Sequence, residues 1–531
     1  AWPALGLAGA LAMAASGGPL MAASAGPATA WWFGLSTGHA GNLAVFYLGM
    51  AGFSVAWLGL GLQLRGDASR RPSPRRLLVV AALWTIPLLA GPVLFTRDVY
   101  SYAAQGTITH LGLNPYTYGP NVLQAFGHSP LVRAVAPVWR ATPAPYGPVF
   151  LAVAGLVMGG AGGHLVAAVA GFKLLDLVGV GLIAWSVPRL ARHLGADPAL
   201  ALWLGLLSPL VLLDFVAAGH NDALMVGLVV AGVTLAVEDH PVTGILLCSL
   251  AATVKVPALA GVAFIAVAWA RRQPDPRDRA AVLAKAGAVA VGALVVITLA
   301  TGLGWGWLSA GTLSTEGNVV TGITPTSAVG TAVATLLRLA GIGVGNAGAV
   351  AAFRVAGLVV GGVVGAVLVL RTRRDTMVIS LAVAFLVVVV AGPVLWPWYL
   401  TWSVVLLAAH PAGQRSRVLV VVLAGYSFVV GPTGANLVSQ SWSLPVAVAM
   451  VVAAVWAWRA GRPVEWPWRG PSGRPSGWLA KEPARGLQYG PGRLRGGPGR
   501  LRGGSDGGRS GPSAHTGLAG PSHDPHTVRQ R

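Results

Sequence analysis

A short polar segment, Thr96 to Tyr102, follows directly after a long apolar run at 77–95 and is the part of the sequence best equipped for chemistry. It reads Thr-Arg-Asp-Val-Tyr-Ser-Tyr. Ionisable groups at the edge of a membrane helix are costly to place and are therefore candidates for function. Asp98 could act as a general base by taking a proton from an attacking hydroxyl. The alternatives are that Asp98 pairs with Arg97 or caps the following helix.

A helix over 98–110 would place Asp98, Tyr102 and Gln105 on one face, because they are spaced by four and three residues. Carboxylate and amide groups hydrogen-bond hydroxyls, and aromatic rings can stack on the faces of sugars. The segment therefore suits a polyhydroxylated substrate. Further candidates for binding the substrate are Arg97 and Tyr100 of the same segment and similar residues of other segments between apolar runs, namely Asn114, Tyr116, Tyr146, His220, Asn221, Asp222, Trp398 and Tyr399.

The segment Gly219-His220-Asn221-Asp222 lies where one apolar run ends and the next begins. Its three polar side chains could bind a sugar or an acceptor, and Asn221 or Asp222 could instead cap the next helix. A metal site built on His220 and Asp222 is less favoured, because no further ligand stands at a suitable spacing. Trp398 and Tyr399 could line an acceptor groove or simply anchor the chain at a membrane interface.

The composition shows what kind of scaffold must position these residues. Hydrophobic residues make up 54% of the 531 positions, charged residues 10%, and the mean hydropathy is +0.67. A soluble domain usually carries about 25% charged residues, so the composition predicts an all-α polytopic membrane protein. The single cysteine, Cys248, allows neither a disulfide within the chain nor a thiolate metal site. The net charge of +21 lies largely in short loops and the tail, so we expect no nucleic-acid partner.

Apolar runs of roughly 20 residues, the length that spans a bilayer, recur along the chain. We expect spans at about 4–24, 43–63, 77–95, 165–187, 199–218, 281–301, 346–370, 376–395, 417–433 and 443–459, with shorter or fused pieces at 222–237, 241–270 and 399–411. The run 241–270 should be a hairpin broken at Lys255-Val256-Pro257, because proline ends helices and lysine seeks an interface. The total is about 13–14 spans in residues 1–460.

Arginine-rich loops predict the orientation of these spans. Loops of this kind stay on the cytoplasmic side, and they occupy 65–76, 189–193, 271–279, 371–374 and 415–417. Counting spans between them places the polar and aromatic segments on the external side, namely 96–148, 219–222, Lys255, 302–330 and 396–399. The count requires that 149–160, about a dozen residues, does not cross the bilayer fully. We expect a multi-pass plasma-membrane protein whose active site faces outward.

The remaining segment, 461–531, has a different composition. It is rich in Gly, Pro, Arg and Ser and repeats Gly-Pro-Gly-Arg-Leu-Arg-Gly at 490–496 and 497–503. A chain of this kind cannot bury enough apolar surface to fold. We expect a disordered cytoplasmic tail held near anionic membrane lipids by its arginines.

Three parts of the loop 96–148 carry a resemblance to a known family. Arg97-Asp98-Val99-Tyr100-Ser101-Tyr102, Gly112-Leu113-Asn114-Pro115-Tyr116 and Pro145-Tyr146-Gly147-Pro148 resemble the first periplasmic loop of the GT-C class of membrane glycosyltransferases. The resemblance is closest to the actinobacterial polyprenol-phosphate-mannose-dependent α-1,6-mannosyltransferases that build lipomannan and lipoarabinomannan cores. It continues through 219–225, 255–257 and 396–400 and covers roughly residues 40–460.

The resemblance implies a GT-C-like bundle, a polyprenyl-phosphate mannose donor, a mannan-type glycolipid acceptor, an α-1,6 linkage, inversion at the sugar carbon and Asp98 as the base. Such a donor needs a cation near the outer headgroups, and Lys255 and then Arg354 are the expected phosphate contacts. Lys173 and Asp176 are three apart and are expected to form a structural ion pair instead. Many members of the wider class have adjacent acidic residues where this chain has Arg97-Asp98, so a divalent metal cofactor is possible but not favoured.

Two other functions fit parts of the sequence. A transporter or flippase of lipid-linked sugars would match the span count, and a broken helix such as 241–270 is common in transporters. The predicted gathering of polar residues at one face rather than at the midplane argues against it. A non-catalytic scaffold that uses its basic tail to bind partners has no support in residues 1–460.

Overall fold

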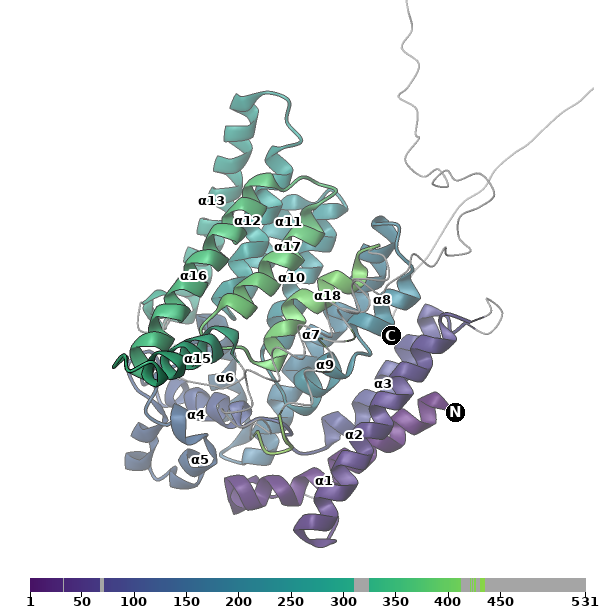
Figure 1. The fold of residues 1–531 in the computed structure, drawn as a ribbon, viewed down its shortest axis with the longest axis vertical. Coiled ribbons are helices and arrows are strands. Elements are labelled where there is room, and N and C mark those ends of the chain that lie inside the picture. Colours follow the sequence, from purple (N-terminus) through teal and green to yellow (C-terminus); the bar gives the residue numbers. More distant parts are fainter. Residues whose placement is uncertain are drawn as a thin grey trace, which may run out of the picture. The chain divides into compact units, whose positions relative to one another are not determined.

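A computed structural model describes residues 1–31, 33–66, 71–309, 324–411, 421, 423, 425 and 430–434. Helices make up the regular secondary structure of these residues (Figure 1), and they contain no β-sheet. The predicted spans 417–433 and 443–459 and the predicted tail 461–531 lie outside the described residues, apart from 421, 423, 425 and 430–433.

The first of three long helices at the start of the chain packs against the other two. They are α1 (Trp2–Ala25), α2 (Gly38–Gln63) and α3 (Pro74–Ala90). Helices α1 and α2 approach closely where Gly9 meets Gly49, because a Cβ on Gly9 would lie only 2.5 Å from the Gly49 carbonyl oxygen. Small residues at such crossings let membrane helices pack backbone to backbone. Trp84 Nε1 on α3 donates to the Pro3 carbonyl at 3.0 Å and ties α3 to α1.

The segment between α3 and the next long helix is built from short helices. In chain order they are α4 (Asp98–His110), η3 (Pro120–Phe126), α5 (Ser129–Ala134), η4 (Pro137–Trp139) and α6 (Pro148–Ala161). Helix α4 packs along α6, and a Cβ on Gly106 would lie 2.5 Å from the Ala154 carbonyl oxygen. The predicted helix over 98–110 is therefore present and is held from one side by α6.

A long helix and a broken one form the centre of the described bundle. Helix α7 (Leu165–His193) packs along α10 (Asp222–Val237). Between them in sequence come α8 (Pro198–Gly205), α9 (Pro209–Val211) and the π-helix η5 (Leu212–Ala217). The chain bends by 48° between α8 and the α9–η5 pair, since a proline inside a helix removes a hydrogen bond and clashes with the preceding turn. The predicted span 199–218 is thus a broken helix.

The second half of the described bundle contains one more interrupted helix. The predicted break at Lys255 is confirmed: α11 ends at Ala252, Lys255 is extended, and η6 starts at Val256. The elements of this half are α11 (Pro241–Ala252), η6 (Val256–Ala258), α12 (Leu259–Ala270), α13 (Pro276–Thr301), η7 (Gly306–Leu308), α15 (Pro325–Leu339), α16 (Asn346–Arg371), α17 (Met377–Ala391), η9 (Pro397–Leu400) and α18 (Thr401–Ala409).

Five of the described helices are long and apolar enough to cross a membrane, namely α1, α2, α7, α13 and α16. The bent pair formed by α8 and the α9–η5 helix would be a sixth if it crosses as one span. In the 18-residue apolar stretches of helices α13 and α16, only 11% and 6% of the residues are buried against protein. Apolar surface of that extent fits contact with lipid rather than water. The chain is an all-α polytopic membrane protein, as predicted, and the count of 13–14 spans remains a prediction.

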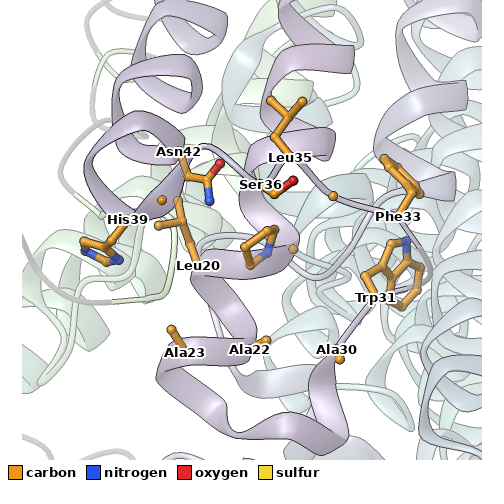
Figure 2. A pocket seen from close by; sticks show the side chains of 14 residues that line it. Leu20, Ala22, Ala23, Ala30, Trp31, Phe33, Leu35, Ser36, His39 and Asn42 are labelled. Carbon is orange, nitrogen blue, oxygen red and sulfur yellow. The ribbon is translucent and has the colours of Figure 1, made fainter.

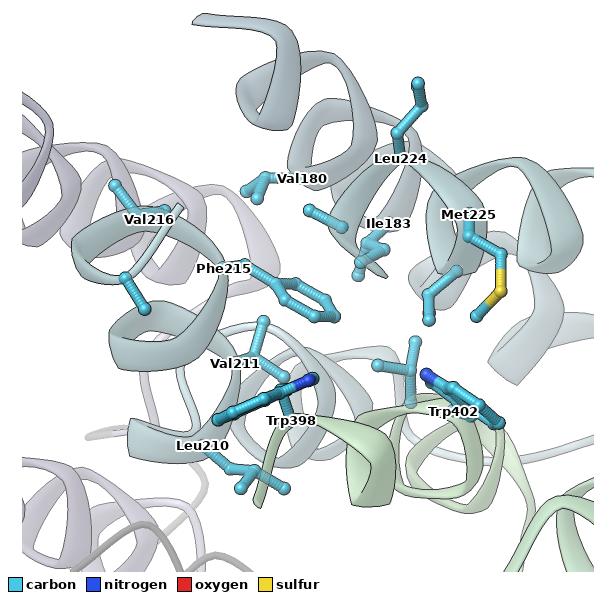
Figure 3. Close-up of a cluster of buried hydrophobic side chains, with 14 of the residues drawn as sticks. Val180, Ile183, Leu210, Val211, Phe215, Val216, Leu224, Met225, Trp398 and Trp402 are labelled. Atoms are coloured by element: carbon cyan, nitrogen blue, oxygen red, sulfur yellow. The ribbon is translucent and has the colours of Figure 1, made fainter. Parts of the chain in front are cut away.

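Apolar side chains from α7, α9, η5, α10, η9 and α18 pack together in one buried cluster (Figure 3). In this view Phe215 of η5 lies below Val180 and Ile183 of α7, and Trp398 of η9 and Trp402 of α18 lie on its other side. Phe215 and Ile183 are fully buried. A close-packed interior of this kind leaves its side chains little freedom to move.

Candidate functional site

A pocket at the start of α4 brings together five residues predicted from the sequence: Asp98, Gln105, Tyr146, Lys255 and Tyr399. They come from three segments that are far apart in the chain. The rest of the lining consists of Ser101, Trp139, Thr142, Pro143, Pro145 and Trp396. One carboxylate, one ammonium and several aromatic rings thus share one pocket.

Asp98 is the first residue of α4, and its side chain is 18% exposed. Its backbone amide donates to the Thr96 hydroxyl at 3.0 Å, which fixes the start of the helix. Ser101 and Gln105 follow at spacings of three and four residues and line the same pocket. The alternative role of Asp98 as a side-chain cap does not apply to α4, because Arg97 occupies the N-cap position and makes no side-chain cap bond.

Tyr102 lies on the buried side of α4 instead. Its ring packs edge-on against Tyr146 at 5.2 Å and Phe150 at 5.0 Å between centroids, and its hydroxyl donates to Asn221 Oδ1 at 3.4 Å. Burial is the main reason that the pKa of Tyr102 is raised well above its usual value, with nearby Tyr146 and carboxylates adding to the effect. Tyr102 is therefore a protonated donor that supports the pocket wall from behind.

The turn 219–222 passes directly behind the pocket. Gly219 has φ +74°, and a Cβ there would lie 2.7 Å from Val99 Cγ2, so glycine is required both for the backbone conformation and for the close approach to α4. His220, Asn221 and Asp222 are each fully buried. Asn221 occupies the N-cap position of α10 but makes no side-chain cap bond, so the capping alternative does not hold for its side chain.

His220 lies between the carboxylate and an indole ring. Its Nδ1 is 3.6 Å from Asp98 Oδ2, and its ring stacks on Trp398 with centroids 3.8 Å apart. Burial, helped by the positive charge of Lys255, holds the pKa of His220 well below its ordinary value. The imidazole is therefore neutral near pH 7, and a carboxylate beside Nδ1 favours the tautomer that carries its proton there.

Lys255 is held by Asp222 and two aromatic rings. Its Nζ lies 3.1 Å and 3.3 Å from the two Asp222 oxygens. Trp402 Nε1 donates to Asp222 Oδ1 at 2.7 Å, which fixes the carboxylate in turn. The ammonium also lies 4.3 Å from the centroid of the Tyr399 ring, within the range of a cation–π contact. The sequence shows no acid near Lys255, but the fold supplies one from α10.

The predicted ion pair between Lys173 and Asp176 is wrong. Lys173 Nζ donates instead to three backbone carbonyls, those of Leu88, Gly91 and Pro92, at 2.8–2.9 Å. These carbonyls lie at the end of α3, where helix carbonyls lack partners and a cation is favourable. Within the described residues, no ion pair within 4.0 Å joins Lys173 to Asp176, and Asp176 Oδ2 is buried without a hydrogen-bond partner.

The other predicted site residues lie outside the pocket lining and make structural contacts. Arg97 donates to the carbonyl and the hydroxyl of Ser24 at the end of α1. Arg354 on α16 donates to Ser327 Oγ at 3.0 Å. The contacts of the remaining residues are as follows: Asn114 Oδ1 accepts from the Tyr116 amide, the Tyr116 hydroxyl donates to the Tyr146 carbonyl, and Tyr100 is buried beside Thr29.

A second cavity of about 550 Å³ lies at the ends of α1 and α2 (Figure 2). Its wall is largely apolar, with Leu20, Trp31 and Phe33, and carries the polar side chains of His39 and Asn42. None of the residues predicted from the sequence lines this cavity. Of these two cavities, only the Asp98 pocket is lined by residues that the sequence predicted to be functional.

Sequence reasoning missed several lining residues as site candidates. Ser101 could have been found, because it stands one helical turn after Asp98. Trp396 and Pro145 belonged to motifs noted in the sequence but were not assigned to the site. Trp139 and Thr142 carry no comparable signal. As for metals, the described residues contain no group of three or more His, Cys, Asp or Glu placed to hold one.

Two family models and several known proteins match most of this chain. Residues 3–271 match the family model described as alpha-(1->6)-mannopyranosyltransferase, N-terminal domain, and residues 326–460 match the MptB C-terminal domain. A probable alpha-(1->6)-mannopyranosyltransferase of Mycolicibacterium smegmatis is 33% identical over 74% of this chain and 75% of its own length. Alpha-(1->6)-mannopyranosyltransferase A of Mycobacterium tuberculosis is 33% identical over 75% and 76%.

A further relative comes from a different genus. Alpha-(1->6)-mannopyranosyltransferase A of Corynebacterium glutamicum is 28% identical over 80% of this chain and 90% of its own length. No solved structure matches the chain significantly. The matched family segment 3–271 contains the polar segment at Asp98, the turn 219–222 and Lys255.

Proposed function

The chain belongs to the alpha-(1->6)-mannopyranosyltransferase family and is a glycosyltransferase, and we propose that it transfers mannose from a polyprenyl-phosphate donor to a mannan-type glycolipid. The new linkage is α-1,6, and the sugar carbon is inverted. The reaction takes place at the external face of the plasma membrane, and the tail 461–531 is cytoplasmic.

The presence of Asp98 and Lys255 in one pocket is the observation that carries this proposal. Transfer from a lipid phosphate needs a base for the acceptor and a cation for the leaving group. Asp98 supplies a partly exposed carboxylate, and Lys255 supplies an ammonium with three N–H donors. The rings of Tyr146, Trp396 and Tyr399 supply flat apolar surfaces for a sugar.

The proposed step is a single displacement. The acceptor hydroxyl gives its proton to Asp98 while its oxygen bonds to the anomeric carbon of the mannose. The bond from that carbon to the phosphate oxygen breaks, and polyprenyl phosphate leaves with the electron pair. Lys255 stabilises the charge on the leaving phosphate, so positioning and electrostatics supply most of the rate enhancement.

We propose that this step needs no divalent metal. The support is the sequence Arg97-Asp98, which has one carboxylate where many GT-C enzymes have two adjacent acids. Lys255 takes the place of a metal ion as the positive charge beside the leaving group. A transporter would also fit the broken helix at Lys255, but the family relatives carry the names of transferases, which favours transfer.

Replacement of Asp98 by Asn tests the proposal. The change removes the base while keeping the size of the side chain, so transfer from polyprenyl-phosphate mannose by membranes carrying the variant should fall by about 10²–10⁴-fold. A matched control is Asp197→Asn, because Asp197 caps α8 by accepting from the Ala199 amide and Asn is an equally good cap. Full activity of Asp98→Asn, at equal protein level, would rule out the proposed base.

A further inference from the structure

The turn 219–222 contacts both charged groups of the pocket. His220 Nδ1 faces Asp98 Oδ2 at 3.6 Å, and Asp222 Oδ2 faces Lys255 Nζ at 3.1 Å. Asn221, between them, accepts from the Tyr102 hydroxyl at 3.4 Å. The side chains of all three turn residues are fully buried. Their burial favours contact with Asp98 and Lys255 over direct contact with a sugar, which was one of the roles that the sequence left open for them.

We propose that the turn 219–222 is the positioning element of the active site: His220 orients Asp98, and Asp222 orients Lys255. The inference rests on the proposed function, in which Asp98 is the base and Lys255 contacts the phosphate. It adds a separate role for residues that do not touch the substrate. Since His220 and Asp222 are two residues apart, one short piece of backbone sets the distance between base and cation.

The orientation of Asp98 follows from the surroundings of His220. The imidazole stacks on Trp398 at 3.8 Å, which fixes the plane of the ring and aims Nδ1 at Asp98. At 3.6 Å the two atoms are not hydrogen-bonded, and Nδ1 is buried without a hydrogen-bond partner. A neutral ring with its proton on Nδ1 can donate to the carboxylate once the two approach, and catalytic hydrogen bonds often tighten when substrate binds. The other charged groups around the turn are Lys255, Asp222, Asp214, Asp176 and Lys173; an Asp176 oxygen lies 3.6 Å and Lys173 Cγ 3.7 Å from the position of a Cβ on Gly219.

The orientation of Lys255 follows from the anchoring of Asp222. Both carboxylate oxygens contact the ammonium, and Trp402 Nε1 holds one of them at 2.7 Å. The rings of Tyr399 and Trp402 lie 4.3 Å and 5.6 Å from Nζ. A long lysine side chain would otherwise sample many rotamers, and this enclosure confines it to the direction of the pocket.

A pair of histidine substitutions tests the first half of the inference. The amide nitrogen of Asn can replace Nδ1 as a donor, whereas that of Gln replaces Nε2. His220→Gln should lower kcat by about 10- to 100-fold and leave the KM for the donor unchanged. Asp98 then loses the N–H group that faces its charged form. The acidic limb of the plot of kcat against pH should therefore move to higher pH. His220→Asn should stay within a few-fold of the native kcat with an unshifted limb.

Two aspartate substitutions test the second half. Asp222→Asn keeps the acceptor for Trp402 but removes the charge that holds Lys255, so the KM for the polyprenyl-phosphate donor should rise by about 10-fold while the acidic limb stays in place. Asp222→Glu keeps the charge but displaces the carboxylate, and it should raise the same KM. If the Asp222→Asn variant does not accumulate in membranes, the Asp222→Glu variant provides the test.

The outcomes separate positioning from a merely structural role and from failure of the proposed function. If the substitutions at His220 and Asp222 lower only the amount of folded protein, and kcat and KM per folded molecule stay unchanged, the positioning role is wrong. An unshifted acidic limb in His220→Gln, alongside an inactive Asp98→Asn, overturns the role of His220 and leaves the base intact. Transfer by Asp98→Asn overturns the role of Asp98 as the base, and with it the role of His220, whereas absence of transfer from polyprenyl-phosphate mannose by the native protein overturns the proposed function itself.

Discussion

Lys255 and Asp222 form a buried ion pair, 3.1 Å apart, that joins the break between α11 and η6 to the first residue of α10. A charge removed from water in this way is tolerated only because its partner is present. Loss of one partner from a buried pair is commonly destabilising by about 3–5 kcal/mol, whereas loss of both is much milder. Single and double substitutions in this pair can therefore distinguish an effect on stability from an effect on catalysis.

Lys255→Met should destabilise the protein by about 3–5 kcal/mol, because Asp222 is left buried with an uncompensated charge. The double variant Lys255→Met, Asp222→Asn should recover most of that stability. It should not recover mannosyl transfer, because the cation for the leaving phosphate is still missing. Thermal unfolding in detergent measures the first effect, and transfer by membranes with equal amounts of folded protein measures the second. Recovery of transfer in the double variant would exclude Lys255 as the phosphate contact.

Gly219→Ala tests the close approach of the turn to α4. Gly112 provides a matched control, because its φ of +73° equals that of Gly219 within a degree and a Cβ there meets nothing within 4 Å. Gly112→Ala should cost about 1–2 kcal/mol from backbone strain alone. Gly219→Ala should cost more and should also impair transfer, since the clash with Val99 pushes the turn away from Asp98. Equal effects on unfolding temperature and on transfer at both positions would show that the contact does not matter.

The lengths of apolar runs predicted much of this fold, because each membrane helix must satisfy its own backbone and therefore leaves a mark in the sequence. The hairpin 241–270, broken at Lys255, is an example. The bend before Pro209 was missed, since proline in a membrane helix can be tolerated without a break.

The site was predictable to a lesser degree, for a physical reason. Asp98, Gln105 and Ser101 share a pocket because of helical periodicity, which the sequence displays. The partners of Lys255 come from residues 33 and more positions away, and no local pattern predicts them. Lys173 was assigned to Asp176 because side-chain spacing is visible in a sequence, whereas the carbonyls at the end of α3 that actually bind it are not.

Replacing Lys173 and Asp176 by uncharged residues should lower the stability of the protein by unequal amounts. Lys173→Met leaves three buried carbonyls of Leu88, Gly91 and Pro92 without their donor, and each unsatisfied group costs roughly 1–3 kcal/mol. Asp176→Asn removes no hydrogen bond given by the structure at Oδ2, so its effect on unfolding temperature should be small. Equal destabilisation by the two variants would restore the ion pair that the spacing predicted.

Glu238, just after α10, should make stability depend on acid pH. It contacts Arg189 at 3.0 Å and His193 at 2.9 Å. The hydrogen bond from Arg189 is the main cause of the lowered pKa of Glu238, with His193 contributing. A carboxyl whose pKa is lower in the folded state stabilises that state above its unfolded pKa and loses this contribution as the pH falls through the folded value.

Glu238→Gln should therefore lower stability at pH 7 by about 1 kcal/mol or less, the range for a partly exposed ion pair. The difference from the native protein should shrink as the pH falls below about 4.5, the ordinary pKa of a glutamate, because both proteins then carry a neutral side chain at this position. Unfolding temperatures of the two proteins in detergent, measured from pH 7 to pH 3, check this. A difference that stays constant over the whole range would mean that Glu238 acts through packing and not through its charge.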